Sequence, residues 1–141
     1  MADEKTRTRQ ILFRGWNGKR WLYGDLLHGR GRSADKLFIL EADATSPILV
    51  ENSTVGQFTG IKDDSGTLIF EGDNVEYTRA HGRGTDTGIV QWEPVLAQFV
   101  LKNPDALLHK DFGEIRYMKP VRIIGNVYGL SEARAKGEGV S

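Results

Sequence analysis

The sequence contains no cysteine. This absence excludes disulfide bonds, thiolate nucleophiles, and zinc or iron–sulfur sites that use cysteine ligands. Stability must therefore come from the packing of apolar side chains. At 141 residues the chain can form one domain, or two very small lobes, with a hydrophobic core.

Long hydrophobic runs are also missing. No apolar stretch approaches the roughly 20 residues that a helix needs to cross a bilayer. Residues 1–7 are too polar for a signal peptide. We therefore expect no contact with a membrane and a cytoplasmic location.

The chain has no excess of either charge, since 19 basic residues balance 19 acidic ones. Zero net charge gives no overall attraction to nucleic acid. The distribution is uneven, however, with +5 over residues 1–32, −7 over 33–78 and +2 over 79–141. Such segregation can orient a protein partner or a second copy of the chain, although a solvated sheet face is the simpler explanation.

Short apolar runs separated by glycine-containing turns make up most of the chain, which is typical of antiparallel β structure. Asn17-Gly18 lies between two aromatic runs and predicts a type I′ hairpin, whose two central residues need positive φ. Helical periodicity is scarce, and short helices are expected at most after Pro104 and briefly within residues 131–141. Residues 1–10 are predicted to be a flexible arm and residues 131–141 a flexible tail.

An internal similarity pairs two parts of the chain at an offset of 48 residues. It aligns Gly24-Asp25 with Gly72-Asp73, and each part reads as a turn, a strand and a Gly-Asp corner. The alignment suggests a duplicated β unit, but glycine-rich sequences align easily, so a chance match stays open.

The segment from Glu71 to Leu101 has the order of predicted elements that is typical of an SH3-like barrel, with one strand, a loop and then two strands in a meander. We therefore predict a mainly β fold in which antiparallel hairpins form a small SH3-like barrel with an N-terminal β subdomain and little helix. Residues 11–130 would form this domain. A division into two lobes, residues 11–55 and 56–130, is the alternative.

Three separated motifs carry a resemblance to a known family. They are Phe13-Arg-Gly-Trp16, then Gln57-Phe-Thr-Gly-Ile-Lys-Asp63 with Gly66 and Ile69-Phe-Glu-Gly-Asp73-Asn-Val75, and finally Ile124-Gly-Asn-Val-Tyr128. In order and spacing the chain resembles the YopX family from about residue 11 to 130. The resemblance implies a mainly β protein from a bacteriophage, prophage or mobile element, with no established activity, and it transfers no catalytic residue.

The residues themselves give little sign of catalysis or metal binding. His28, His81 and His109 lie far apart, and no serine has the surroundings of a nucleophile. The carboxylates at Asp63-Asp64, Glu71 and Asp73 lack calcium-loop spacing, so a structural role is the better explanation. We predict no catalytic, metal-binding or cofactor-binding residue and no cofactor.

Basic residues interleaved with aromatic ones are more suggestive, because arginine contacts phosphates while exposed aromatic rings stack on bases. The same residue types are also common in protein interfaces. The candidate partner-binding residues are Arg14, Trp16, Arg20, Trp21, Arg79, His81 and Arg83. The alternative is that the aromatic rings of the first hairpin pack on its inner face.

The prediction for function is a non-enzymatic binding or assembly module that acts in the cytoplasm of a bacterial host cell. Its expected partner is a second copy of the chain, in a homo-oligomer, or an unidentified host or phage protein. The first alternative is nucleic-acid binding through the basic and aromatic hairpin, which the zero net charge does not favour. The second alternative is an enzyme of unknown type.

Overall fold

The computed structural model describes residues 9–79, 84–103 and 110–130. Antiparallel strands in two sheets make up most of these residues, and the described helices are short 3-10 turns, at Gly31–Ser33, Asn52–Thr54 and Phe112–Tyr117 (η5). The prediction of a mainly β fold with little helix is therefore confirmed. The predicted tail, most of the predicted arm (residues 1–8) and residues 104–109 after Pro104 lie outside the described residues.

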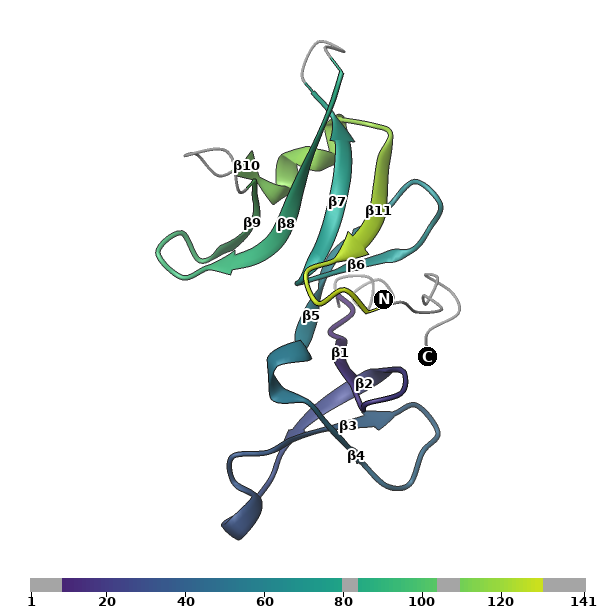
Figure 1. Ribbon diagram of the computed structural model, residues 1–141, viewed down its shortest axis with the longest axis vertical. Helices are drawn as coiled ribbons and strands as arrows, with labels where there is room; N and C mark the ends of the chain where they lie inside the picture. The colour runs from purple at the N-terminus through teal and green to yellow at the C-terminus, as the bar shows by residue number, and fades with distance from the viewer. Residues whose placement is uncertain (1–8, 80–83, 104–109, 131–141) are drawn as a thin grey trace, which may run out of the picture.

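The N-terminal half forms a six-stranded sheet in the order β4-β3-β2-β1-β5-β6 (Figure 1). Its strands are β1 (Phe13–Trp16), β2 (Trp21–His28), β3 (Leu37–Glu41), β4 (Ile48–Val50), β5 (Gly56–Lys62) and β6 (Leu68–Phe70). Strands β1 to β4 occupy the lower part of Figure 1, and β5 runs from them into the upper part.

The C-terminal half forms a five-stranded sheet in the order β10-β9-β8-β7-β11. Its strands are β7 (Asp73–Thr78), β8 (Thr85–Glu93), β9 (Gln98–Lys102), β10 (Lys110–Asp111) and β11 (Val121–Asn126). The predicted meander of one strand, a loop and two more strands is present as β7, β8 and β9. The strand order of the described residues is open at β10 and β11, so an SH3-like barrel stays a prediction.

The first hairpin is confirmed, but its predicted turn type is wrong. Trp16 pairs with Trp21, which leaves the four residues 17–20 in the loop. Positive φ occurs at Gly18 (102°) and not at Asn17, whereas a type I′ turn needs it at both. The Asn17 side chain instead accepts hydrogen bonds from Lys19 N and Arg20 N, each at 2.8 Å.

The proposed Gly-Asp duplication is not supported by the backbone. Gly72 has φ of 96° in the turn before β7, so that copy does form a corner. Gly24 and Asp25 instead lie inside β2, paired with Glu41 and Leu40. The glycine at position 24 serves close packing, because a Cβ there would lie 2.1 Å from the carbonyl oxygen of Leu40.

Among the described residues, the buried apolar side chains form three clusters along the molecule. One lies within β2 to β4, with Leu22, Ile39 and Val50, and the largest lies under the second sheet and η5. The third contains Leu12, Phe58, Leu68 and Phe70, so it draws on residues from both sides of position 55. The division into lobes 11–55 and 56–130 stays a prediction.

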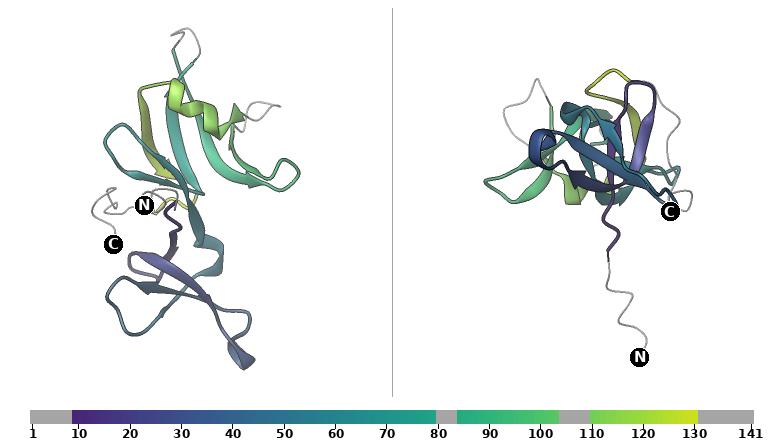
Figure 2. Two further views of the ribbon diagram at one scale, coloured as in Figure 1. Left: turned by 180° about the vertical axis from the view of Figure 1, so that it is seen from behind. Right: turned by 90° about the horizontal axis from the view of Figure 1, so that it is seen from below.

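Two aspartates attach the loop between β5 and β6 to the edge strand β11. Asp64 Oδ2 accepts a hydrogen bond from Val121 N at 2.9 Å, and Asp64 N donates to Val121 O at the same distance. Asp63 Oδ1 accepts from Ser65 N and Thr67 N inside its own loop, both at 2.9 Å. Seen from behind, the loop lies beside β11 (Figure 2). These carboxylates have a structural role, as expected.

We predict that Asp63→Ala lowers the free energy of unfolding by about 2 kcal/mol, because it leaves partly buried N–H groups of the loop without an acceptor. Urea denaturation followed by circular dichroism measures the change. Asp25→Ala, at an exposed position of β2, is the matched control and should change stability by less than about 0.5 kcal/mol. Equal losses in the two variants would contradict the role assigned to Asp63.

Candidate functional site

Arg14 and Trp21, two of the candidate partner-binding residues, lie in the interior. Their exposed fractions are 0% and 4%. Neither side chain can reach a partner in this structure, so the prediction is corrected for both. The reason is packing: the guanidinium carbon of Arg14 lies 4.2 Å from the centroid of the Trp21 ring and 5.2 Å from that of Phe70.

Arg14 instead forms a buried ion pair between the two sheets. Its Nη1 lies 3.0 Å from Oδ1 of Asp73, and both side chains have no exposed surface. Arg14 Nη2 also donates to the backbone oxygen of Glu71 at 3.3 Å. Asp73 Oδ2 accepts a hydrogen bond from Phe70 N at 2.8 Å. The pair thus connects β1 of the first sheet to the start of β7 in the second.

Two other candidates lie on the first hairpin, near the surface. Arg20 makes a two-pronged ion pair with Glu41, at 3.1 and 3.0 Å, and this hydrogen bonding raises the pKa of the Arg20 guanidinium. Trp16 is half-buried and packs edge-to-face on Trp21 at 5.5 Å between centroids. Its ring contributes to the packing of the hairpin, as the alternative interpretation expected.

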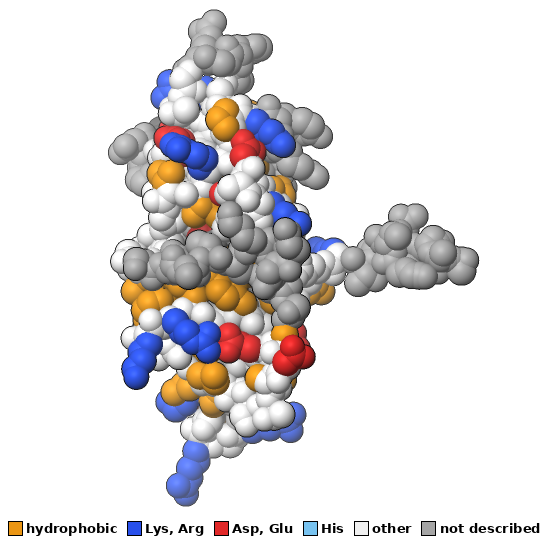
Figure 3. Space-filling view, turned by 90° about the vertical axis from the view of Figure 1, so that its right-hand side faces the viewer, with side chains coloured by type: hydrophobic (Ala, Val, Ile, Leu, Met, Phe, Trp, Pro, Cys, Tyr) orange, Lys and Arg blue, Asp and Glu red, His pale blue; other side chains and the backbone are white. Residues whose placement is uncertain are grey.

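The loop candidates are only partly described. Arg79 is exposed and lies 3.9 Å from a carboxylate oxygen of Asp86, while His81 and Arg83 lie outside the described residues. On the face drawn in Figure 3, basic and acidic side chains lie next to one another in the lower half of the molecule. The described candidates therefore do not form one basic surface.

A different set of residues forms a site around Trp92. Trp92 on β8 pairs with Phe99 on β9, and their rings meet edge-to-face with centroids 5.2 Å apart. The next pair on the same strand faces, Val90 and Leu101, is buried in the core. Trp92, by contrast, is 47% exposed, so the apolar face of the hairpin continues past the end of the core.

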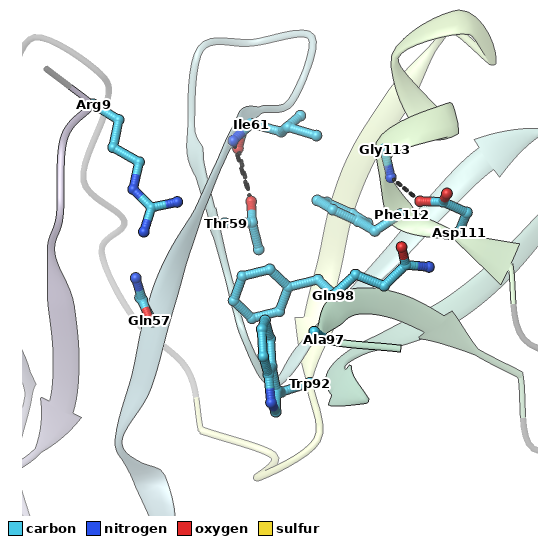
Figure 4. A pocket seen from close by; sticks show the side chains of 11 residues that line it. Arg9, Gln57, Thr59, Ile61, Trp92, Ala97, Gln98, Asp111, Phe112 and Gly113 are labelled. Atoms are coloured by element: carbon cyan, nitrogen blue, oxygen red, sulfur yellow. Dashed lines mark hydrogen bonds between the residues drawn. The ribbon is translucent and has the colours of Figure 1, made fainter. Parts of the chain in front are cut away.

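Three cavities meet at Trp92, and we call them together the Trp92 groove. The largest has a volume of about 410 Å³ and lies between β5 and the β8–β9 hairpin. In Figure 4, Gln57 and Thr59 lie on one side of it, Gln98 and Phe112 on the other, and Trp92 at its lower end. The other two, of about 280 and 300 Å³, continue past Trp92 toward Glu71 and Tyr128.

Glu71 supplies a carboxylate to the groove. Glu71 and Gln57 bind each other through two hydrogen bonds, from Glu71 N to Gln57 O at 3.0 Å and from Gln57 N to Glu71 Oε1 at 3.3 Å. Burial raises the pKa of Glu71, and the hydrogen bond from Gln57 and the charge of Arg14 oppose this rise. Burial also raises the pKa of the Tyr128 phenol, which has Arg14, Glu71 and Asp73 as charged neighbours.

The charged groups lining the groove are of both signs. Arg9 and Asp111 line the largest cavity, and Glu71 lines the two smaller ones. The described residues contain no group of three or more ligand side chains that could hold a metal ion. The groove therefore combines aromatic rings, the side-chain amides of Gln57 and Gln98, and isolated charges.

Sequence reasoning missed Trp92, Phe99 and Glu71 as site residues. The two rings belong to short apolar runs that predict strands and nothing more, and Glu71 is expected to have only a structural role. One signal was present: Val95-Leu96, an apolar pair, follows Pro94 in a tight turn where polar residues are usual. The two side chains are 89% and 55% exposed.

The described residues define an antiparallel two-sheet β protein with a buried ion pair between its sheets and an open aromatic groove. The family model described as YopX protein matches residues 12–133. The chain belongs to the YopX family, as the resemblance predicted. A search of curated proteins found no match. Within the part of the chain that the structure describes, no helix is long and apolar enough to cross a membrane.

We predict that Asp73→Asn destabilises the fold by about 3 kcal/mol, because it leaves the Arg14 guanidinium in the interior without its carboxylate. The double change Arg14→Met with Asp73→Asn should recover part of this loss. Arg20→Met, which breaks the exposed pair with Glu41, serves as the control and should cost under about 1 kcal/mol. Urea denaturation decides, and a loss in Asp73→Asn no larger than in the control would contradict the prediction.

A second prediction concerns Glu71, whose pKa is raised in the folded state. Protonation of Glu71 therefore stabilises the folded state. This stabilisation is complete at pH values below the pKa that Glu71 has in the unfolded chain, and it is lost as the pH rises through the raised pKa of the folded state. Glu71→Gln mimics the protonated form. We expect it to raise the melting temperature slightly at pH 7 and to have no effect below about pH 4.

Calorimetry across this pH range tests the prediction, with Glu51→Gln at an exposed position as the control. A stabilisation by Glu71→Gln that does not change with pH would show that the carboxylate charge is not its cause.

Proposed function

We propose that this protein is a non-enzymatic binding module whose Trp92 groove takes an extended peptide segment of a protein partner. The observation that carries the proposal is the exposure of the β8–β9 hairpin. Trp92, Val95 and Leu96 on this hairpin are 47%, 89% and 55% exposed, beside a cavity of about 410 Å³. Large exposed apolar side chains at a concave surface mark interaction sites.

The shape and lining of the groove favour a peptide. The three cavities share Trp92 in their linings, and a row of cavities suits an extended chain better than a compact ligand. The amide side chains of Gln57 and Gln98 line opposite sides and can donate to and accept from peptide groups (Figure 4). The Trp92 and Phe99 rings offer an apolar surface for side chains of the segment.

The charges of the groove disfavour a nucleic acid. Glu71 and Asp111 line the groove together with Arg9, so carboxylates outnumber the basic group and repel phosphates. The predicted basic hairpin is weakened as an alternative site, because Arg14 and Trp21 are buried and Arg20 is paired with Glu41.

The proposal extends to the setting in which the protein acts. Membership of the YopX family supports an origin in a bacteriophage or prophage and action in the cytoplasm of the host cell. An SH3-like barrel formed around the β7–β8–β9 meander remains our proposal for the second sheet. The homo-oligomer also remains a prediction, with a second copy of the chain as the competing occupant of the groove.

Peptide display tests the proposal. We expect a random 12-residue library panned on the full chain to yield binders, and Trp92→Ala to weaken them roughly 30-fold, as the loss of a tryptophan hot spot worth about 2 kcal/mol would. Isothermal titration calorimetry measures the affinity. Leu49→Ala, at a 50% exposed apolar position on β4 outside the groove, is the matched control and should bind normally.

Three outcomes would overturn the proposal: no binder from the library, binders that Trp92→Ala does not affect, or a concentration-dependent dimer that Trp92→Ala abolishes. The last outcome would place a second copy of the chain in the groove. Circular dichroism checks that each variant is folded, and Gln98→Ala, with a smaller change in packing, serves as a second groove variant.

A further inference from the structure

We propose that the smallest cavity of the Trp92 groove takes one cationic side chain of the bound segment, the ammonium group of a lysine or the guanidinium group of an arginine. Gln57, Glu71, Trp92 and Phe99 line this cavity, which has a volume of about 280 Å³. The inference rests on the proposed function, since it names the residue type that the groove selects in its peptide.

The aromatic rings supply the first attraction. Trp92 and Phe99 meet edge-to-face, with 76° between the ring planes. In such a pair one ring contributes only its edge, so the pairing leaves both faces of that ring unused. A cation over the face of a tryptophan or phenylalanine is attracted by the ring quadrupole, and the attraction strengthens when water is excluded. Trp92 and Phe99 both line this cavity, so a cation that enters it lies beside their rings, and the bound segment would shield it from water.

The carboxylate of Glu71 supplies the second attraction, and its negative charge selects a positively charged side chain. The Arg14 guanidinium lies against Asp73 at 3.0 Å and reaches Glu71 through its backbone oxygen. Burial raises the pKa of the Glu71 carboxyl despite Arg14, so the protein compensates this charge incompletely. A cation entering from the groove would provide the missing compensation.

The surrounding charges leave this cavity negative. Arg9 and Asp111 line the largest cavity, whereas neither lines the smallest, so Glu71 is the ionisable residue of its lining. The charged and titratable groups that act on Glu71 and its neighbour Tyr128 are Arg14 and Asp73. Gln57 adds a side-chain amide whose oxygen can accept a hydrogen bond from the bound cation.

Small probes test the inference on the full chain by NMR. Acetylated, amidated arginine and lysine carry the cation, while the citrulline and norleucine derivatives match them in shape without charge. We expect saturable shifts of the Trp92 indole and Gln57 amide signals with either cationic probe, at least about fivefold tighter than with its neutral match. Tighter binding of the arginine probe would show that the cavity recognises the guanidinium group. Equal affinities for the arginine and lysine probes would show that it recognises only the positive charge.

Glu71→Gln should weaken the cationic probes to the level of the neutral ones, while Glu51→Gln leaves them unchanged. Because Glu71 must be ionised to attract the cation, binding should weaken as the pH falls through its raised pKa, and this pH dependence should vanish in Glu71→Gln. Glu71→Gln is expected to remain folded, so a loss of binding reports on the carboxylate.

The result that overturns the inference is a neutral probe that binds as tightly as its cationic match, or cationic binding that Glu71→Gln does not change. Display peptides then separate this failure from that of the proposed function. Peptides that depend on Trp92 but show no enrichment of lysine or arginine would remove the cation site and keep the peptide groove. A library without binders would remove the proposed function itself.

Discussion

The buried ion pair between Arg14 and Asp73 is the constraint on which the rest of the structure depends. A full charge in the interior is tolerated only with an opposite charge beside it, so β1 and the start of β7 have a fixed relative position. Aromatic rings enclose the guanidinium, which removes it from water and makes its distance from Asp73 important. Two of the three family motifs meet at this pair, because Arg14 belongs to the first and Asp73 to the second.

The groove follows from the same constraint. The turn that places Asp73 against Arg14 also contains Glu71 and Gly72, and Gly72 lies so close to the Tyr128 ring that a Cβ would come within 2.8 Å of its hydroxyl oxygen. Tyr128 and Glu71 are thereby held on the groove side of the turn. The ion pair itself makes no contact with solvent, yet it positions the carboxylate that faces the groove. The short segment Glu71–Asp73 thus contributes both to the stability of the fold and to the proposed binding site.

The sequence predicts the β architecture well, because glycine turns and short apolar runs are local signals. The meander of β7, β8 and β9 and the first hairpin are present at the expected residues. The site was harder to predict. Arg14 reads as a phosphate contact until its distant partner Asp73 is seen, and Gly24-Asp25 reads as a corner although it lies inside a strand. Trp92 looks like a core residue because strand alternation gives the face of a side chain but not where the covering layer ends.

The attachment of Asp63 and Asp64 to β11 has a consequence for the behaviour of the protein at high concentration. An edge strand with open N–H groups can recruit a strand from another molecule and so start a fibril. Here the N–H of Val121 donates to Asp64 and that of Ile123 to Asp63, at 2.9 and 3.3 Å. Two acidic side chains thus occupy donors that an incoming strand would need, and they add negative charge where it would approach. This loop therefore protects the edge of the sheet from aggregation.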